Sequence, residues 1–98
     1  MVYSYRRLAE KPWAYFLKPP GVRLVPVAKL KTIRARPSGI EHAEQHMYEA
    51  AYEDGPKRKP ITVQAEGDHW IVLDGNSTTA VARSQRWRFL PAVVVKGS

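Results

Sequence analysis

Cysteine is absent from this sequence of 98 residues. The absence excludes a disulfide scaffold, a thiolate zinc site and a cysteine nucleophile. No apolar run approaches the roughly 18 residues that a membrane-spanning helix needs. The first seven residues, MVYSYRR, also lack the continuous apolar stretch of a secretory signal. We therefore expect a cytoplasmic protein.

Several common catalytic motifs are missing as well. The sequence contains no Walker loop, no Gly-x-Gly-x-x-Gly loop and no Gly-x-Ser-x-Gly nucleophile turn. The length corresponds to one domain with a single modest core. Hydrophobic residues make up 44% of the chain, which argues against wholesale disorder.

Acidic residues are scarce and unevenly placed. Nine Asp and Glu stand against sixteen Lys and Arg, for a net charge of +7. Residues 1–36 carry nine basic residues and one acid, residues 37–56 carry five acids and no Lys or Arg, and residues 57–98 carry seven basic residues and three acids. A basic surface attracts the phosphates of nucleic acids or of nucleotides. Small basic proteins also stay soluble this way, so charge alone leaves the partner open.

The spacing of apolar residues predicts strands and helices in the order strand, helix, strand, strand, helix, strand. The predicted elements are residues 22–27, 38–54, 61–65, 69–74, 77–86 and 90–95. This order is typical of an α+β domain with a small mixed sheet and two main helices. Ser38 and Glu41 have the spacing of a helix capping box, and Pro26 places the first strand at a sheet edge or ends it there. In the strand 69–74 we expect Ile71 and Leu73 to face the core.

Residues 1–21 are predicted to be an N-terminal extension of a domain that spans residues 22–98. Half of the ten aromatic residues lie in this extension, namely Tyr3, Tyr5, Trp13, Tyr15 and Phe16. They either cover an open edge of the core or dock on a partner, for instance by stacking on single-stranded bases. We favour the first interpretation.

A polar turn follows the strand 69–74 and leads into the second helix. Gly75 permits a positive φ, and Asn76 or Ser77 can cap the helix. The first amides of a helix lack intrahelical acceptors and can hold a phosphate. The predicted phosphate-binding residues are Gly75, Asn76, Ser77, Thr78 and Thr79. Asp74 repels phosphate, but it can bind Mg²⁺ or accept a proton, and it is the catalytic candidate. The same residue types are also ordinary turn and cap residues.

The residues around this turn resemble the ParB/sulfiredoxin superfamily. Its pattern of an apolar strand, an acidic-Gly-polar turn, an Ala-rich helix and a Pro-led last strand is matched by IVLDGNSTTAVARSQRWRFLPAVVV. Upstream, Val25 to Leu30 resembles the opening strand with its Leu box, and residues 50–63 resemble the helix–Gly–x–Pro–Ile–x–Val segment. The resemblance covers about residues 22–96 and implies a ParB/sulfiredoxin-like fold.

The resemblance also implies a nucleotide-handling protein. Partition proteins of this superfamily bind and hydrolyse CTP, sulfiredoxins and free-serine kinases use the equivalent turn for ATP or ADP chemistry, and other members are nucleases. It follows that the chain is expected to bind ATP or CTP at the turn, with Mg²⁺ through Asp74, as an NTPase or phosphotransferase. Arg34 and Arg36 lie in the loop after the first strand, where they would reach the same phosphates.

The sequence departs from the superfamily pattern at the turn itself. After Asp-Gly-Asn the superfamily usually has His-Arg, whereas this chain has Ser77 and Thr78. Charge-assisted hydrogen bonds are roughly twice as strong as neutral ones, so the hydroxyls are poor replacements. Either the site binds without turnover, or it draws an arginine from elsewhere, with Arg34, Arg36 and Arg83 as candidates. The sulfiredoxin cysteine is absent, which excludes that activity.

Two other function classes remain open from the residues. Lys57, Arg58 and Lys59 form a basic run that can contact nucleic-acid backbone, which fits a non-catalytic, sequence-independent nucleic-acid-binding module. A metal-dependent ParB-like nuclease is weaker, because no carboxylate pair is clustered in the sequence.

His42 and His46 are spaced to share a metal ion on one helix face. Only Glu49 or His69 offers a third ligand, and the pattern is not that of a zinc protease. We interpret this face as solvated and expect no resident metal beyond Mg²⁺. The oligomeric state is open.

Overall fold

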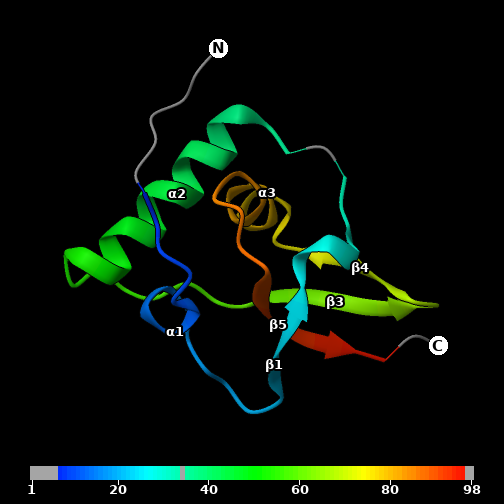
Figure 1. Ribbon diagram of the computed structural model, residues 1–98. Helices are drawn as coiled ribbons and strands as arrows, with labels where there is room; N and C mark the ends of the chain where they lie inside the picture. The colour runs from blue at the N-terminus through cyan, green and yellow to red at the C-terminus, as the bar shows by residue number, and fades with distance from the viewer. Residues whose placement is uncertain (1–6, 34, 97–98) are drawn as a thin grey trace.

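The computed structural model describes residues 7–33 and 35–96 (Figure 1). The elements in chain order are α1 (Pro12–Tyr15), β1 (Val22–Pro26), the short 3-10 helix η1 (Val27–Lys29), β2 (Leu30–Lys31), α2 (Pro37–Tyr52), β3 (Ile61–Glu66), β4 (His69–Asp74), α3 (Asn76–Ser84) and β5 (Phe89–Val95). The predicted α+β class and the order of its six main elements are confirmed. The sequence patterns missed α1, η1 and β2, which are each two to four residues long.

The strands form one mixed sheet in the order β1-β5-β3-β4-β2. β3 and β4 are an antiparallel hairpin, β5 runs parallel to β3, and β1 pairs antiparallel with β5 at the edge. The edge position of β1 agrees with Pro26, which cannot donate to a ladder and ends this strand. Because β3 and β4 form a hairpin, the start of β3 lies beside the end of β4, where the polar turn begins.

The helices α2 and α3 lie on the same side of the sheet (Figure 1). Fully buried apolar side chains from both layers form the core, including Val25, Val63 and Leu90 of the sheet, Met47 of α2 and Val81 of α3. Burial of this apolar surface supplies the main driving force for folding. None of the helices in residues 7–33 and 35–96 is long and apolar enough to cross a membrane.

Part of the N-terminal extension shares this core. Leu8, Tyr15 and Phe16 are at most 1% exposed. The Tyr15 ring lies 5.2 Å from the Trp87 ring, and Trp87 Nε1 donates to the carbonyl of Leu8 at 2.8 Å. Tyr15 and Phe16 therefore cover an edge of the core. Tyr3 and Tyr5 lie outside the described residues.

Two local predictions were wrong. α2 begins at Pro37 after Arg36, which has an extended backbone and makes no side-chain cap bond, so Ser38 and Glu41 form no capping box. Proline suits the first helical position because its missing N–H would have no partner there. In β4 Val72 is buried and Trp70 packs against the core, while Leu73 is 50% exposed and Ile71 is only partly buried, so the opposite face of the strand from the predicted one is turned to the core. Because residues 70–73 are all apolar, alternation does not fix which face is buried.

Candidate functional site at the turn between β4 and α3

Gly75 closes the turn between β4 and α3. Its φ of 109° lies in the left-handed region, and it stands immediately before the first residue of α3. A Cβ atom at this position would lie 2.4 Å from Cγ2 of Ile61. Glycine is therefore required twice, by the backbone conformation and by the close approach of β3. The predicted positive φ at Gly75 is confirmed.

The side chains of the turn make contacts with different parts of the fold. Thr79 Oγ1 donates to the carbonyl of Gly75 at 2.9 Å, and Asn76 Oδ1 accepts from the backbone N–H of Ile33 at 3.1 Å. Neither Asn76 nor Ser77 makes a side-chain cap bond, so the predicted capping role is wrong. Ser77 Oγ lies against Gly39 of α2, at 2.8 Å from where a Cβ would stand. Of the predicted phosphate-binding hydroxyls, Thr78 is the one that lines the adjoining pocket.

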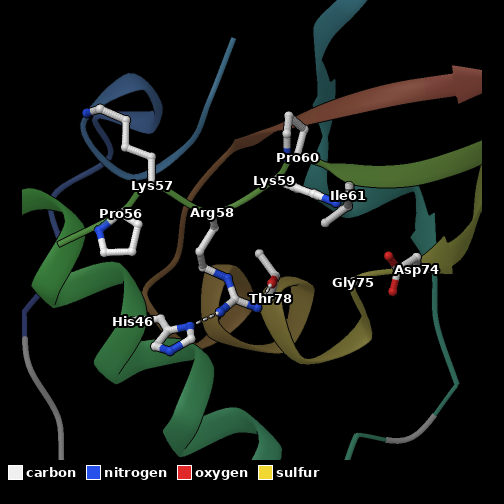
Figure 2. A pocket seen from close by; sticks show the side chains of 10 residues that line it. All are labelled: His46, Pro56, Lys57, Arg58, Lys59, Pro60, Ile61, Asp74, Gly75 and Thr78. Atoms are coloured by element: carbon white, nitrogen blue, oxygen red, sulfur yellow. Dashed lines mark hydrogen bonds between the residues drawn. The ribbon is translucent and has the colours of Figure 1, made fainter. Parts of the chain in front are cut away.

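That pocket has a volume of about 340 Å³ and lies between the turn, α2 and the segment before β3 (Figure 2). Its lining residues are His46, Pro56, Lys57, Arg58, Lys59, Pro60, Ile61, Asp74, Gly75 and Thr78. We call it the turn pocket. It brings the basic run 57–59 and the predicted phosphate turn into one site, although the sequence analysis treated them as separate.

Arg58 crosses the turn pocket from the 56–60 segment. Its Nη2 donates to Thr78 Oγ1 at 3.2 Å, and its Nη1 lies 2.9 Å from Nδ1 of His46 (Figure 2). The backbone of Arg58 is also fixed, because its N–H donates to the carbonyl of Tyr15 at 2.9 Å and its carbonyl accepts from Leu17 at 2.8 Å. The guanidinium is thus anchored beside the first turn of α3.

The charge of Arg58 is partly shielded from water. Burial lowers the pKa of its guanidinium, and the negative charge of Asp74 opposes that shift. Arginine nevertheless remains charged in proteins, so the turn pocket contains a fixed cation. The Nε atom of Arg58 is buried and finds no hydrogen-bond partner among the described residues. A partly desolvated guanidinium is suited to an oxyanion, because its charge-assisted hydrogen bonds are strong.

This chain is similar in structure to several proteins of known structure. No family model and no curated protein matches it. A mutant free serine kinase in complex with ADP is 17% identical, with a TM-score of 0.63 over 80% of this chain and 32% of that chain. The C-terminally truncated chromosome-partitioning protein ParB from Caulobacter crescentus, complexed with CTP-γ-S, is 16% identical, with a TM-score of 0.59 over 80% of this chain and 46% of that chain. Sulfiredoxin from Arabidopsis thaliana is 12% identical, with a TM-score of 0.56 over 80% of this chain and 88% of that chain.

This chain has the ParB/sulfiredoxin-like fold. It spans about a third of the serine kinase chain and about half of the ParB chain. At these identities the likeness shows the fold alone, so the chemistry has to be argued from the side chains.

The sequence resemblance leads us to expect a His-Arg pair after Asp-Gly-Asn, where this chain has Ser77 and Thr78. The structure brings another histidine and another arginine to the same turn, His46 from α2 and Arg58 from the segment before β3. Sequence patterns predict Arg58 as a nucleic-acid contact and His46 as part of a solvated histidine pair, and place neither at this turn. The available signal was the hairpin, because pairing β3 with β4 brings residues just before Ile61 beside Asp74 and Gly75.

Of the other predicted cations, Lys57 and Lys59 also line the turn pocket, whereas Arg36 and Arg83 do not. Lys57 Nζ donates to the carbonyls of Trp13 and Ala14 at 3.0 and 3.1 Å, and Lys59 is exposed at the pocket rim. Arg36 is exposed at the start of α2 and does not line the turn pocket. Arg83 donates to Thr32 Oγ1 at 2.8 Å and to the carbonyl of Leu30. Arg34 lies outside the described residues.

A second pocket of about 440 Å³ includes Asn76 of the turn. Its apolar walls come from Ile33, Ala35, Ile40 and Ala80, and its polar groups are Thr32, Asn76, Arg83 and Ser84. Asn76 reaches this pocket while Gly75 and Thr78 line the other, so the N-terminal turn of α3 stands between the two.

No group of three or more His, Asp or Glu side chains in the described part of the chain is placed to hold a metal ion. The rings of His42 and His46 have centroids 4.3 Å apart on an exposed face of α2. Nδ1 of His46 is engaged with Arg58, which leaves Nε2 as its one other ring nitrogen.

Proposed function

We propose that this protein binds a nucleotide, with its phosphates in the turn pocket. The observation that carries the proposal is the Arg58 guanidinium, which lies 3.2 Å from Thr78 Oγ1 at the first turn of α3. Arginine gives charge-assisted hydrogen bonds to phosphate, and the free amides of a helix N-terminus add donors and a favourable dipole. Gly75 has no side chain that would obstruct the approach of a phosphate.

The solved structures support a nucleotide rather than a plain phosphate. The free serine kinase is described in complex with ADP, and ParB in complex with CTP-γ-S. The second pocket offers apolar walls and a few polar groups within reach of the same turn, which suits a nucleoside. We assign the phosphates to the turn pocket and the nucleoside to the second pocket.

Asp74 gives the site a possible chemistry beyond binding. Its carboxylate is exposed at the turn pocket and faces the same space as Arg58. Mg²⁺ binds proteins through one or two carboxylates together with substrate phosphates and water, so a single exposed aspartate fits it. Bound there, Mg²⁺ would neutralise phosphate charge. The same carboxylate is placed to accept a proton from a hydroxyl acceptor, which would make the activity phosphoryl transfer or NTP hydrolysis.

The test is thermal unfolding with ATP, ADP, CTP, GTP or inorganic phosphate, each with and without Mg²⁺. A ligand at 100 times its Kd stabilises a protein by about 2.7 kcal/mol. For a domain of this size the expected Tm increase is roughly 10–20 °C. An increase with at least one nucleotide that exceeds the increase with phosphate is expected.

The variant Arg58→Ala should remove most of this increase, because it deletes the cation beside Thr78. Lys59→Ala is the comparison variant: it removes the same charge from the same segment and pocket, but from an exposed side chain, so a smaller loss is expected. Equal increases in wild type and Arg58→Ala would show that the nucleotide phosphates bind elsewhere. No increase with any nucleotide would refute the proposal.

A further inference from the structure

The contact between His46 and Arg58 fixes the chemical form of the histidine. A guanidinium has only donors, so His46 Nδ1, at 2.9 Å from Arg58 Nη1, must be the acceptor. The ring proton then lies on Nε2. A proton on Nδ1 would remove this hydrogen bond, because the Nδ1–H of His46 would then point at the Nη1–H of Arg58.

The backbone of Arg58 does not by itself decide where its guanidinium lies. The bonds to Tyr15 and Leu17 hold the main chain, and Phe16 pairs with it as an isolated bridge. The contacts that orient the guanidinium are those to His46 on α2 and Thr78 on α3. Contacts with α2 and α3 therefore determine the direction of the Arg58 side chain, although Arg58 belongs to neither helix.

Asp74 acts electrostatically on the same guanidinium. It lines the turn pocket, and its negative charge raises the pKa of Arg58 against the larger, lowering effect of burial. Yet the two side chains form no ion pair, as judged over residues 7–33 and 35–96. An Arg58–Asp74 ion pair would neutralise the cation that a phosphate needs. An interaction that holds the guanidinium away from Asp74 therefore keeps the pocket able to bind phosphate.

We propose that His46 is a positioning residue that holds the Arg58 guanidinium at the turn between β4 and α3 and away from Asp74. This inference rests on the proposed function, since it concerns the residue that would bind the phosphates. His46 itself makes no contact with the ligand in this arrangement. Its effect on affinity passes through Arg58.

The experiment is calorimetric titration of the full chain with ATP and CTP in Mg²⁺-free buffer containing EDTA. His46→Leu keeps the helix but removes the acceptor, and its affinity for the bound nucleotide should fall about tenfold, the effect of losing one charge-assisted hydrogen bond. His46→Asn restores an acceptor near the position of Nδ1 and should lie within about threefold of wild type. His42→Leu, one turn earlier on the same face, should bind as wild type does.

A double-mutant comparison tests the competition with Asp74. Asp74→Asn removes a repulsive charge in any background and should strengthen Mg²⁺-free nucleotide binding modestly in wild type. In the His46→Leu background it also removes the competing partner of Arg58, so the gain should be several-fold larger. Equal gains in the two backgrounds would contradict the proposed competition.

A ligand-free measurement separates this inference from the proposed function. ¹⁵N-detected imidazole spectra should show His46 with its proton on Nε2 in wild type, and a shift of that spectrum in Arg58→Ala but not in Lys59→Ala. A proton on Nδ1 in neutral His46 would overturn the positioning role whatever the protein binds. Nucleotide binding that is lost in Arg58→Ala but intact in His46→Leu would overturn it and leave the proposed function standing. Absence of nucleotide binding in wild type would refute both.

Discussion

Glycine is required at position 75 for two reasons, the positive φ and the close approach of Ile61. Gly75→Ala forces a side chain into a φ of 109° and to 2.4 Å from Ile61 Cγ2. Left-handed strain and overpacking each cost about 1–3 kcal/mol, so we expect the free energy of unfolding to fall by about 3 kcal/mol. Urea denaturation measures it.

Gly67 provides the control for this prediction. It has a φ of +60° in the turn between β3 and β4, and no atom lies within 4 Å of a Cβ added there. Gly67→Ala should therefore cost only the backbone term, about 1 kcal/mol. If the two variants lose the same stability, the close approach of Ile61 to the turn is not the reason for glycine at position 75.

The sequence predicts the parts of the site that depend on contacts between neighbouring residues. Gly75 and the strand–turn–helix around it follow from neighbouring residues, and the structure confirms them. The partnership of Arg58 with Thr78 joins residues 20 apart, and that of Arg58 with His46 joins residues 12 apart across different elements. Such contacts depend on how α2 and α3 pack, which no local spacing encodes. This is why sequence patterns point to Arg34, Arg36 and Arg83, and not to Arg58, as the source of the missing cation.

At the scale of whole elements, alternation and helical periodicity gave the correct order of the main strands and helices because each buries one face. The errors came where a local event overrides periodicity. Four successive apolar residues in β4 hide which face is buried, a proline begins α2 one residue before the predicted Ser38, and β2 is too short to show a pattern.

A buried hydrogen bond joins the N-terminal segment to the residues just before β5. Trp87, just before β5, is 4% exposed, and its Nε1 donates to the carbonyl of Leu8 in a buried hydrogen bond of 2.8 Å. Trp87→Phe keeps most of the packing against Tyr15 but leaves that carbonyl unpaired, which should lower the free energy of unfolding by about 1–3 kcal/mol.

Hydrogen exchange tells whether this bond holds the N-terminal segment to the rest of the fold. The amide of Phe16, bonded to the carbonyl of Pro12, should exchange faster in Trp87→Phe than in wild type, while the amides of β3 change only with global stability. Uniform acceleration in both places would indicate that residues 7–16 unfold together with the sheet.

The charge of the whole molecule separates nucleotide binding from the alternative of a nucleic-acid-binding module. A net charge of +7, with nine basic residues in positions 1–36, favours any polyanion. Binding that rests on six to ten phosphate contacts loses roughly 10³–10⁵ in affinity between about 50 and 200 mM salt. A nucleotide held by the half-buried Arg58 and backbone amides should lose less than about tenfold over the same range, because partly buried charges are screened much less than exposed ones.

The measurement is the affinity for ATP or CTP and for a single-stranded oligonucleotide over this salt range, in wild type and in Arg58→Ala. Specific nucleotide binding predicts a shallow slope that Arg58→Ala shifts to weaker affinity throughout, with the oligonucleotide hardly affected by the substitution. If the nucleotide instead shows the steep slope of the oligonucleotide and both respond alike to Arg58→Ala and Lys59→Ala, the basic surface and not the turn pocket binds phosphate. The distinction holds because a pocket acts through one placed cation, whereas a surface acts through the sum of its charges.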